Sequence, residues 1–216
     1  SEKVLYKFKV TANANDVYLF KFSFYVGSST LQATTTSFGV YAYSDSAYSL
    51  ADSTFSSDGL LNYGSCSNGL NSAKSLGAQA VYPGGIVEVY MDKGATSVCN
   101  VATTTYKVPS GETRWFVLKA TISNVETASS VTENISTYLF GDAAFPILIP
   151  NLMGQAKFPL QGAVTVGVDL DTHNDFIWSP NSTSSTNAPG DLDFTNGYGL
   201  TGLPATNMPE EILTSN

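Results

Sequence analysis

The sequence predicts an all-β protein: an immunoglobulin-like or jelly-roll β-sandwich with long loops and an irregular C-terminal tail. The first observation is that Val17–Val26 alternates in period two, which is typical of a strand with one buried face. The second is that several other segments repeat this alternation, and the third is that no segment keeps a helical period. Large apolar side chains on one face of a sheet need a second layer to cover them, so two packed sheets are expected.

The strand expected at Val17–Val26 is the one around which the other segments are organised. Its apolar face consists of Phe20, Phe22, Phe24 and Val26, and its other face of Lys21, Ser23 and Tyr25. A turn at Ala12–Asp16 joins it to a preceding strand, so the two strands form a predicted hairpin.

Five further strands are expected in chain order. They are Val4–Val10, Ser37–Tyr43, Ile86–Met91, Thr113–Ile122 and Val131–Phe140. The segment Pro109–Glu112 predicts a turn, because proline presets φ and Gly111 tolerates positive φ. The polar segment Gly27–Thr36 is expected to be a loop, and short helical turns are expected in Ser44–Asp52 and at Pro209–Leu213.

We expect one sandwich domain over residues 1–168, with a loop insertion over residues 44–80. Residues 169–216 are expected to be an irregular tail packed on the sandwich, because prolines interrupt the chain from residue 146 onward and polar residues dominate thereafter.

The composition narrows the class of protein. The chain has 216 residues, 43% hydrophobic and only 13% charged, against about 25% charged in an average globular protein. Its net charge is −8, and no cluster of cations suits nucleic acid or an anionic membrane. The sequence shows no leader and no apolar run that would insert into a membrane, and its strand-like start suggests a processed N-terminus. We therefore expect an extracellular, cell-surface location.

The two cysteines, Cys66 and Cys99, are predicted to form a disulfide if the protein is exported. In the chain-entropy model, a disulfide that closes a loop of this length stabilises the fold by roughly 3–4 kcal/mol. The alternative is a pair of free buried thiols in a reducing compartment.

Four motifs carry a family resemblance. They are VLYKFKVTANANDVYLFKFSF at 4–24, VPSGETRWFVLKATI at 108–122, NDFIWSPNSTSST at 174–186 and DLDFTNGYGLTGLP at 191–204. Together they resemble a module of very large S-layer-like and adhesin-like surface proteins of ultra-small candidate-phylum bacteria. The resemblance implies an immunoglobulin-like sandwich at or near a natural C-terminus, with the N-terminal part of a longer protein absent. It implies no catalytic or ligand residues.

Acidic loops in the tail suggest a calcium site, since hard oxygen ligands in flexible loops suit Ca²⁺. The candidate ligands are Asp169, Asp171, Asp175, Asp191 and Asp193. Their spacing is not that of an EF-hand, because Asn174 and Pro180 occupy the positions of its glycine and glutamate. The alternative is solvated, turn-capping side chains, with no cofactor at all.

Two sequons, at Asn134 and Asn181, are candidate glycosylation sites. Trp178 and Tyr198 lie in loop-like sequence and are expected to pack the tail over the sandwich, the alternative being a sugar-stacking surface.

No enzyme activity is expected. The sequence has neither a GxSxG nor an HExxH motif, and its one histidine, His173, has no obvious nucleophile partner.

The sequence therefore favours a structural protein whose partners are identical subunits, associating into a surface layer, filament or stalk. The proposed assembly strand is Val4–Val10, with its apolar residues Val4, Tyr6, Phe8 and Val10, because a terminal, strongly strand-forming segment suits edge-strand exchange. The alternative is a cell-surface adhesin or carbohydrate-binding module whose partners are glycans or other surface proteins.

Overall fold

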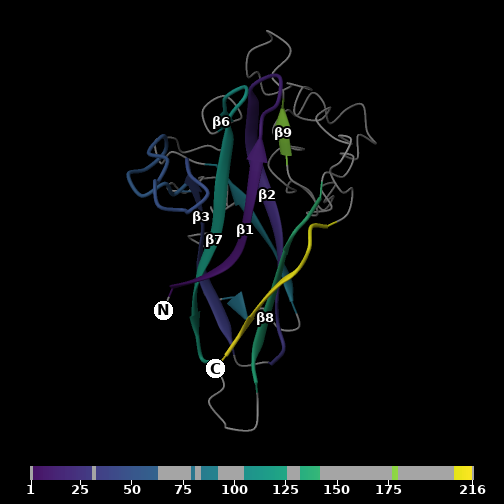
Figure 1. Cartoon of the computed structure of the whole chain (residues 1–216). Helices are drawn as coiled ribbons and strands as arrows, with labels where there is room; N and C mark the ends of the chain where they lie inside the picture. Colours follow the sequence, from purple (N-terminus) through teal and green to yellow (C-terminus); the bar gives the residue numbers. More distant parts are fainter. Residues whose placement is uncertain are drawn as a thin grey trace, which may run out of the picture.

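The structure is a computed structural model that describes residues 2–30, 33–62, 79–80, 84–91, 105–125, 132–141, 177–179 and 207–215. Within these ranges the chain forms ten β-strands in two antiparallel sheets and contains no helix (Figure 1). The prediction of an all-β fold is confirmed. Assignment to the immunoglobulin-like or the jelly-roll class stays a prediction.

The first sheet has four strands in the order β1-β7-β3-β4. They are β1 (Glu2–Thr11), β7 (Thr113–Ser123), β3 (Thr34–Tyr43) and β4 (Gln79–Ala80). The second sheet has the order β10-β8-β2-β5, and β6 and β9 also pair with β2. Its strands are β10 (Glu211–Thr214), β8 (Asn134–Leu139), β2 (Val17–Ser28), β5 (Gly85–Tyr90), β6 (Tyr106–Val108) and β9 (Ile177–Ser179).

An aromatic cluster joins the two sheets. The ring of Phe8 on β1 lies 4.9 Å from that of Phe22 on β2 and 5.0 Å from that of Phe116 on β7. Phe22 and Phe116 are themselves 5.6 Å apart and almost fully buried. Aromatic pairs at such separations add to the hydrophobic stabilisation of a core. The inner faces of both sheets therefore contribute to one apolar core.

The alternation expected for β2 is confirmed where its side chains are described. Phe22, Phe24 and Val26 are buried, while the side chain of Phe20 is outside the described residues. Ser23, expected on the polar face, is fully buried as well, so that face is also covered. On β3 the expected face of Phe38, Val40 and Ala42 is confirmed, and all three are fully buried.

The turn at Pro109–Glu112 is confirmed. Gly111 has a φ of 79°, and the Glu112 N–H donates a hydrogen bond to the Pro109 carbonyl over 3.0 Å. This turn connects β6 in the second sheet to β7 in the first.

Several features differ from those expected. The hairpin predicted for β1 and β2 is wrong, because β1 pairs with β7 in the first sheet whereas β2 belongs to the second sheet. The loop predicted at Gly27–Thr36 is shorter, because β2 continues to Ser28 and β3 begins at Thr34, where it pairs with Ser123 of β7. The helical turn predicted at Ser44–Asp52 is wrong. That segment consists of bends and turns, and the Asp45 carboxylate accepts hydrogen bonds from the backbone N–H groups of Ala47, Ser49 and Leu50.

The C-terminal segment also differs from the expectation. A helical turn was predicted at Pro209–Leu213, but Glu211–Thr214 forms β10 and pairs with β8. A second short strand, β9, lies in the part of the tail expected to be loop-like. Both strands have too few residues to show a period-two pattern in the sequence. Pairing with a longer neighbouring strand determines their conformation. The domain boundary expected at residue 168 lies outside the described residues.

We predict that Phe116→Ala lowers the free energy of unfolding by about 3–5 kcal/mol, because it leaves a cavity where three aromatic rings meet. Chemical denaturation monitored by circular dichroism measures this change. Val4→Ala is the control, since Val4 is 42% exposed and its truncation should cost less than about 1 kcal/mol. Equal losses in the two variants would contradict the assignment of Phe116 to the core.

Candidate functional site

β1 lies at the edge of the first sheet. It pairs with β7 along its whole length, from Glu2 opposite Thr121 to Thr11 opposite Thr113. Figure 1 shows β1 beside β7 at the front of the view, with the N-terminus at its lower end. The proposed assembly strand is therefore an edge strand with one strand neighbour in its sheet.

A β-bulge changes which side chains of β1 point inward. The register shifts between Val4 and Tyr6, so Leu5 and Tyr6 are both buried and Val4 is exposed. The expectation that Val4 shares one face with Tyr6, Phe8 and Val10 is therefore wrong at Val4. Phe8 and Val10 are partly buried and pack against the core.

The free edge of β1 has features that oppose the addition of a further strand. Lys3, Lys7 and Lys9 are exposed along it, and the bulge interrupts its regular pleat. Natural sheets use lysines and bulges in this way to prevent edge-to-edge aggregation. These features do not oppose exchange of β1 itself, because an exchanged strand forms the same contacts with β7.

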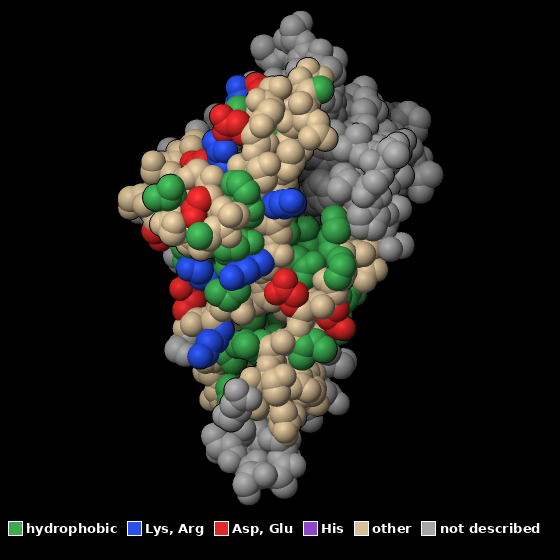
Figure 2. Space-filling view, viewed as in Figure 1, with side chains coloured by type: hydrophobic (Ala, Val, Ile, Leu, Met, Phe, Trp, Pro, Cys, Tyr) green, Lys and Arg blue, Asp and Glu red, His purple; other side chains and the backbone are tan. Residues whose placement is uncertain are grey.

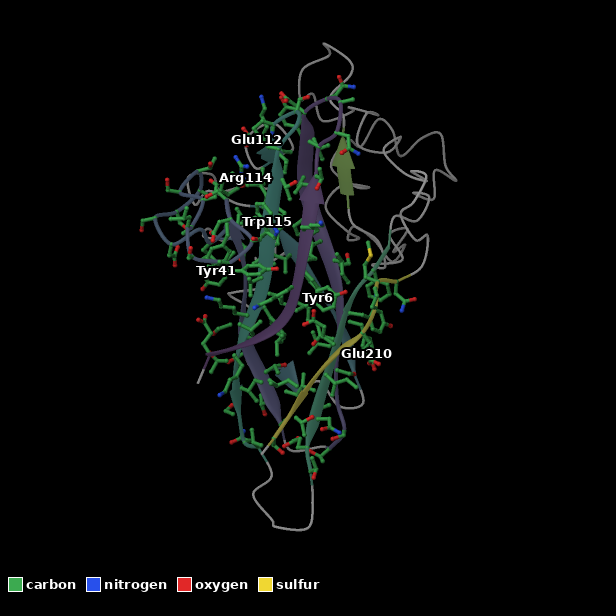
Figure 3. The ribbon with its side chains drawn as sticks, in the orientation of Figure 1. Tyr6, Tyr41, Glu112, Arg114, Trp115 and Glu210 are labelled. Carbon is green, nitrogen blue, oxygen red and sulfur yellow. The ribbon has the colours of Figure 1, made fainter. Side chains whose placement is uncertain are left out.

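The C-terminal segment closes against β1. The buried Tyr6 hydroxyl donates a hydrogen bond to the Pro209 carbonyl over 2.7 Å. Burial and the nearby Glu211 carboxylate raise the pKa of Tyr6, so this phenol remains a donor at neutral pH. Figure 3 shows Tyr6 between β1 and the C-terminal segment that carries Glu210. We call this meeting of the two sheet edges the β1–β10 seam.

Backbone hydrogen bonds hold the C-terminal segment to β8 at both ends. The Met208 N–H donates to the Leu139 carbonyl, and the Ser215 N–H donates to the Glu133 carbonyl, each over 2.8 Å. Tyr6 is therefore bonded to a segment that is fixed in the second sheet, and this bond links the two sheets at their edges.

A cavity of about 460 Å³ opens at one end of the β1–β10 seam. The described residues that line it are Lys3, Ala33, Ile122, Val125, Glu133, Ile135, Leu213, Thr214 and Ser215. The Glu133 carboxylate is buried there and accepts hydrogen bonds from the hydroxyls of Ser28 and Thr30 and from the Ala33 N–H. These bonds give Glu133 a structural role, because they tie β8 to the connection between β2 and β3.

A second polar network lies at the opposite end of the core. The Asp52 carboxylate accepts hydrogen bonds from the Tyr106 hydroxyl at 2.7 Å and from Arg114 Nε at 2.9 Å. Arg114 also pairs with Glu112, and both are labelled at the start of β7 in Figure 3. The network connects loop 44–62 to β6 and β7, and thus to both sheets.

The ionisation of this network is biased toward charged Asp52 and neutral Tyr106. Burial acts to raise the pKa of Asp52, but hydrogen bonds from Thr54, Tyr106 and Arg114 outweigh it and lower the pKa overall. Burial and the hydrogen bond to Asp52 raise the pKa of Tyr106. The arrangement is a satisfied ion pair, which suits a structural role for Asp52 and Arg114.

Of the predicted site residues, Asn134 is the first residue of β8, where its N–H donates to the Ser29 hydroxyl and it pairs with Thr214. Glycosylation of Asn134 stays a prediction. The other candidates lie outside the described residues or have undescribed side chains: Cys66, Cys99, Asp169, Asp171, His173, Asp175, Trp178, Asn181, Asp191, Asp193 and Tyr198.

Two features are absent from the described part of the chain. No group of three or more His, Cys, Asp or Glu side chains is placed there to hold a metal ion. No helix of sufficient length and apolarity to span a membrane is found among those residues.

Comparison with protein families, with curated proteins and with solved structures finds no match to this chain.

We predict that Asp52→Asn lowers the free energy of unfolding at neutral pH by about 1–3 kcal/mol. The free energy of unfolding of this variant should also change less with pH in the acid range. The folded-state pKa of Asp52 lies below its unfolded value of about 4, so the ionised group stabilises the fold above that pH. This contribution is lost as the pH falls through the folded-state pKa. Denaturation midpoints between neutral and acid pH measure it. Arg114→Lys is the control that keeps the charge and the acid dependence, and an unchanged acid dependence in Asp52→Asn would contradict the prediction.

We predict that Tyr6→Phe loosens the β1–β10 seam. The variant leaves the Pro209 carbonyl without its donor and should cost about 1 kcal/mol. Amide hydrogen exchange should become faster in β1 and in residues 207–215, and remain unchanged in β5. Tyr18→Phe on the second sheet is the control. If Tyr6→Phe leaves β1 exchange unchanged, the hydrogen bond does not hold the seam.

Proposed function

We propose that this chain is an extracellular structural protein that associates with identical chains into a surface layer, filament or stalk by exchange of β1. The observation that carries the proposal is that β1 is an edge strand with one strand neighbour in its sheet, yet it fills part of the core. A neighbour's β1 would supply the same residues to the same positions.

The side chains of β1 explain why exchange would give a tight contact. Leu5 and Tyr6 are buried, and Phe8 packs on Phe22 and Phe116. A chain whose β1 has left would expose this part of its core to water, which is strongly unfavourable. Donor-strand contacts of this kind combine backbone pairing with side chains that fill pockets. Free chains would therefore be driven to accept a neighbour's strand.

The connection from β1 to β2 would have to open during exchange. The Ala12 N–H donates to the Glu112 carbonyl, and the Asp16 carboxylate accepts from the Ser110 N–H and pairs with Lys107. These contacts hold the connection against the turn at Pro109–Glu112. Exchange requires their release, so it is expected to be slow.

The composition supports the extracellular and structural parts of the proposal. The low charged fraction, the two cysteines and the resemblance to surface-protein modules favour an exported protein. The second candidate, an adhesin or carbohydrate-binding module, is favoured by aromatic and cationic side chains on the outer face of the first sheet.

We predict an interchain disulfide in a mixture of the single variants Thr11→Cys and Thr113→Cys. The two hydroxyl oxygens lie 2.9 Å apart on directly opposed, exposed residues of β1 and β7, so a cysteine pair there can form a bond. Exchange places Thr11 of one chain opposite Thr113 of another. Non-reducing gel electrophoresis after mild oxidation detects the mixed dimer.

The double variant Thr11→Cys/Thr113→Cys is the matched control. Oxidised before assembly, it holds β1 on its own chain and should remain monomeric, and reduction should restore assembly seen by negative-stain electron microscopy. If the oxidised double variant assembles like the unmodified chain, β1 exchange is not the mechanism. Deletion of β1 is a poorer test, because it removes Leu5, Tyr6 and Phe8 from the core.

A further inference from the structure

The cations of the chain are concentrated on two neighbouring strands. β1 and β7 carry five of the ten Lys and Arg residues, and one of the eighteen Asp and Glu residues. The five are Lys3, Lys7, Lys9, Arg114 and Lys119, and the acid is Glu2. This strand pair therefore has a formal charge of +4 in a chain of net −8. Figure 2 shows the blue side chains gathered mainly over β1 and β7.

Aromatic side chains lie beside these lysines on the outer face of the first sheet. Lys9 of β1 is opposite Trp115 of β7, which is opposite Tyr43 of β3. In the next row on the same face, Lys7 and Tyr41 flank Val117. Trp115 and Tyr43 are partly exposed, whereas Phe116 and Ala42 beside them in sequence are buried in the core. We call Lys7, Lys9, Tyr43, Tyr48, Trp115 and Lys119 the aromatic–lysine face.

The lysines of this face are not neutralised by carboxylates. Among the described residues Lys7, Lys9 and Lys119 form no ion pair. Lys7 Nζ instead lies 4.6 Å from the centre of the Tyr48 ring, and Lys119 Nζ lies 4.4 Å from that of Tyr41. Such cation–π contacts orient a lysine without cancelling its charge.

Trp115 also has no polar or ring contact that would occupy its side chain within the described part of the chain. Within the described part of the chain its indole has no ring contact and its N–H has no hydrogen-bond partner. Figure 3 shows Trp115 on β7 and Tyr41 nearby, both beside loop 44–62. A partly exposed indole next to unpaired lysines offers a flat apolar surface bordered by positive charge.

One member of this face, Tyr48, lies in loop 44–50 and has a strained backbone conformation. Tyr48 has a φ of 57°, a left-handed conformation that costs a non-glycine residue about 1 kcal/mol. Hydrogen bonds from Ser49 and Leu50 to the Asp45 carboxylate hold the loop, and Tyr48 then reaches both Lys7 and Tyr43. Strained backbone conformations cluster at ligand-binding sites, so the strain at this partly exposed aromatic residue is consistent with a binding role.

We propose that the aromatic–lysine face binds an acidic polysaccharide. The apolar face of a sugar ring stacks on Trp115, and its carboxylate groups pair with Lys7 and Lys9. Nucleic acid is the other polyanion that stacks on aromatic residues, but it needs a continuous cationic track, and this strand pair carries five cations in a chain of net charge −8. The polysaccharide therefore fits the charge and the limited extent of the face better.

Calorimetric titration of the full chain with polygalacturonate tests the proposal, with dextran and oligothymidylate as comparison probes. We expect binding of polygalacturonate that weakens as salt increases, and weaker or no binding of the other two. Trp115→Ala should weaken binding about tenfold, and Trp115→Phe should retain most of it. In a Trp178→Phe background Trp115 is the one remaining tryptophan, so its fluorescence should change on binding.

Lysine variants provide the matched control. Lys9→Gln removes an exposed charge opposite Trp115 and should weaken binding, even if Trp115→Ala proves unable to fold. Lys3→Gln removes a charge from the same strand that faces the cavity in the β1–β10 seam, and it should bind like the unmodified chain. The proposal is overturned if polygalacturonate does not bind, if dextran or oligothymidylate binds as tightly, or if Lys3→Gln and Lys9→Gln lose binding equally.

Discussion

The contact of Phe8 with Phe22 and Phe116 is the interaction on which the rest of the structure depends. Phe8 belongs to an edge strand, Phe116 to its neighbour in the same sheet, and Phe22 to the opposite sheet. One ring thus joins three strands and both sheets. It also makes β1 essential to the core, although this strand has one neighbour in its sheet.

The longer strands could be predicted from the sequence, because burial of one face leaves a period-two pattern. The residues expected on the inner faces of β2, β3 and β7 are buried or partly buried where they are described, although Ser23, Tyr41 and Val117 on the opposite faces are buried as well. The bulge in β1 could not be predicted, since the alternation of Val4, Tyr6, Phe8 and Val10 with Leu5, Lys7 and Lys9 is complete without one. The short strands β9 and β10 have too few residues for a pattern, and their conformation comes from the partner strands β2 and β8.

The contacts that define the candidate sites could not be predicted for a different reason. Tyr6 and Pro209 are 203 residues apart, and Asp52 and Arg114 are 62 apart, so their pairing depends on the strand order. The sequence did offer one usable signal, because Arg114 is the one arginine of the chain and lies in a predicted strand. A cation at an inward-facing position of a strand requires a buried partner.

The two faces of the first sheet carry different kinds of side chain. The inner side of β1 carries the apolar residues that an exchanged strand would bring to a neighbour, and its outer side carries Lys7 and Lys9. Trp115 and Tyr43, which complete the aromatic–lysine face, belong to β7 and β3. In an exchanged assembly this face would therefore contain residues of two chains. A polysaccharide bound across it would contact both the donated strand and the chain that received it, so ligand binding and strand exchange would stabilise each other.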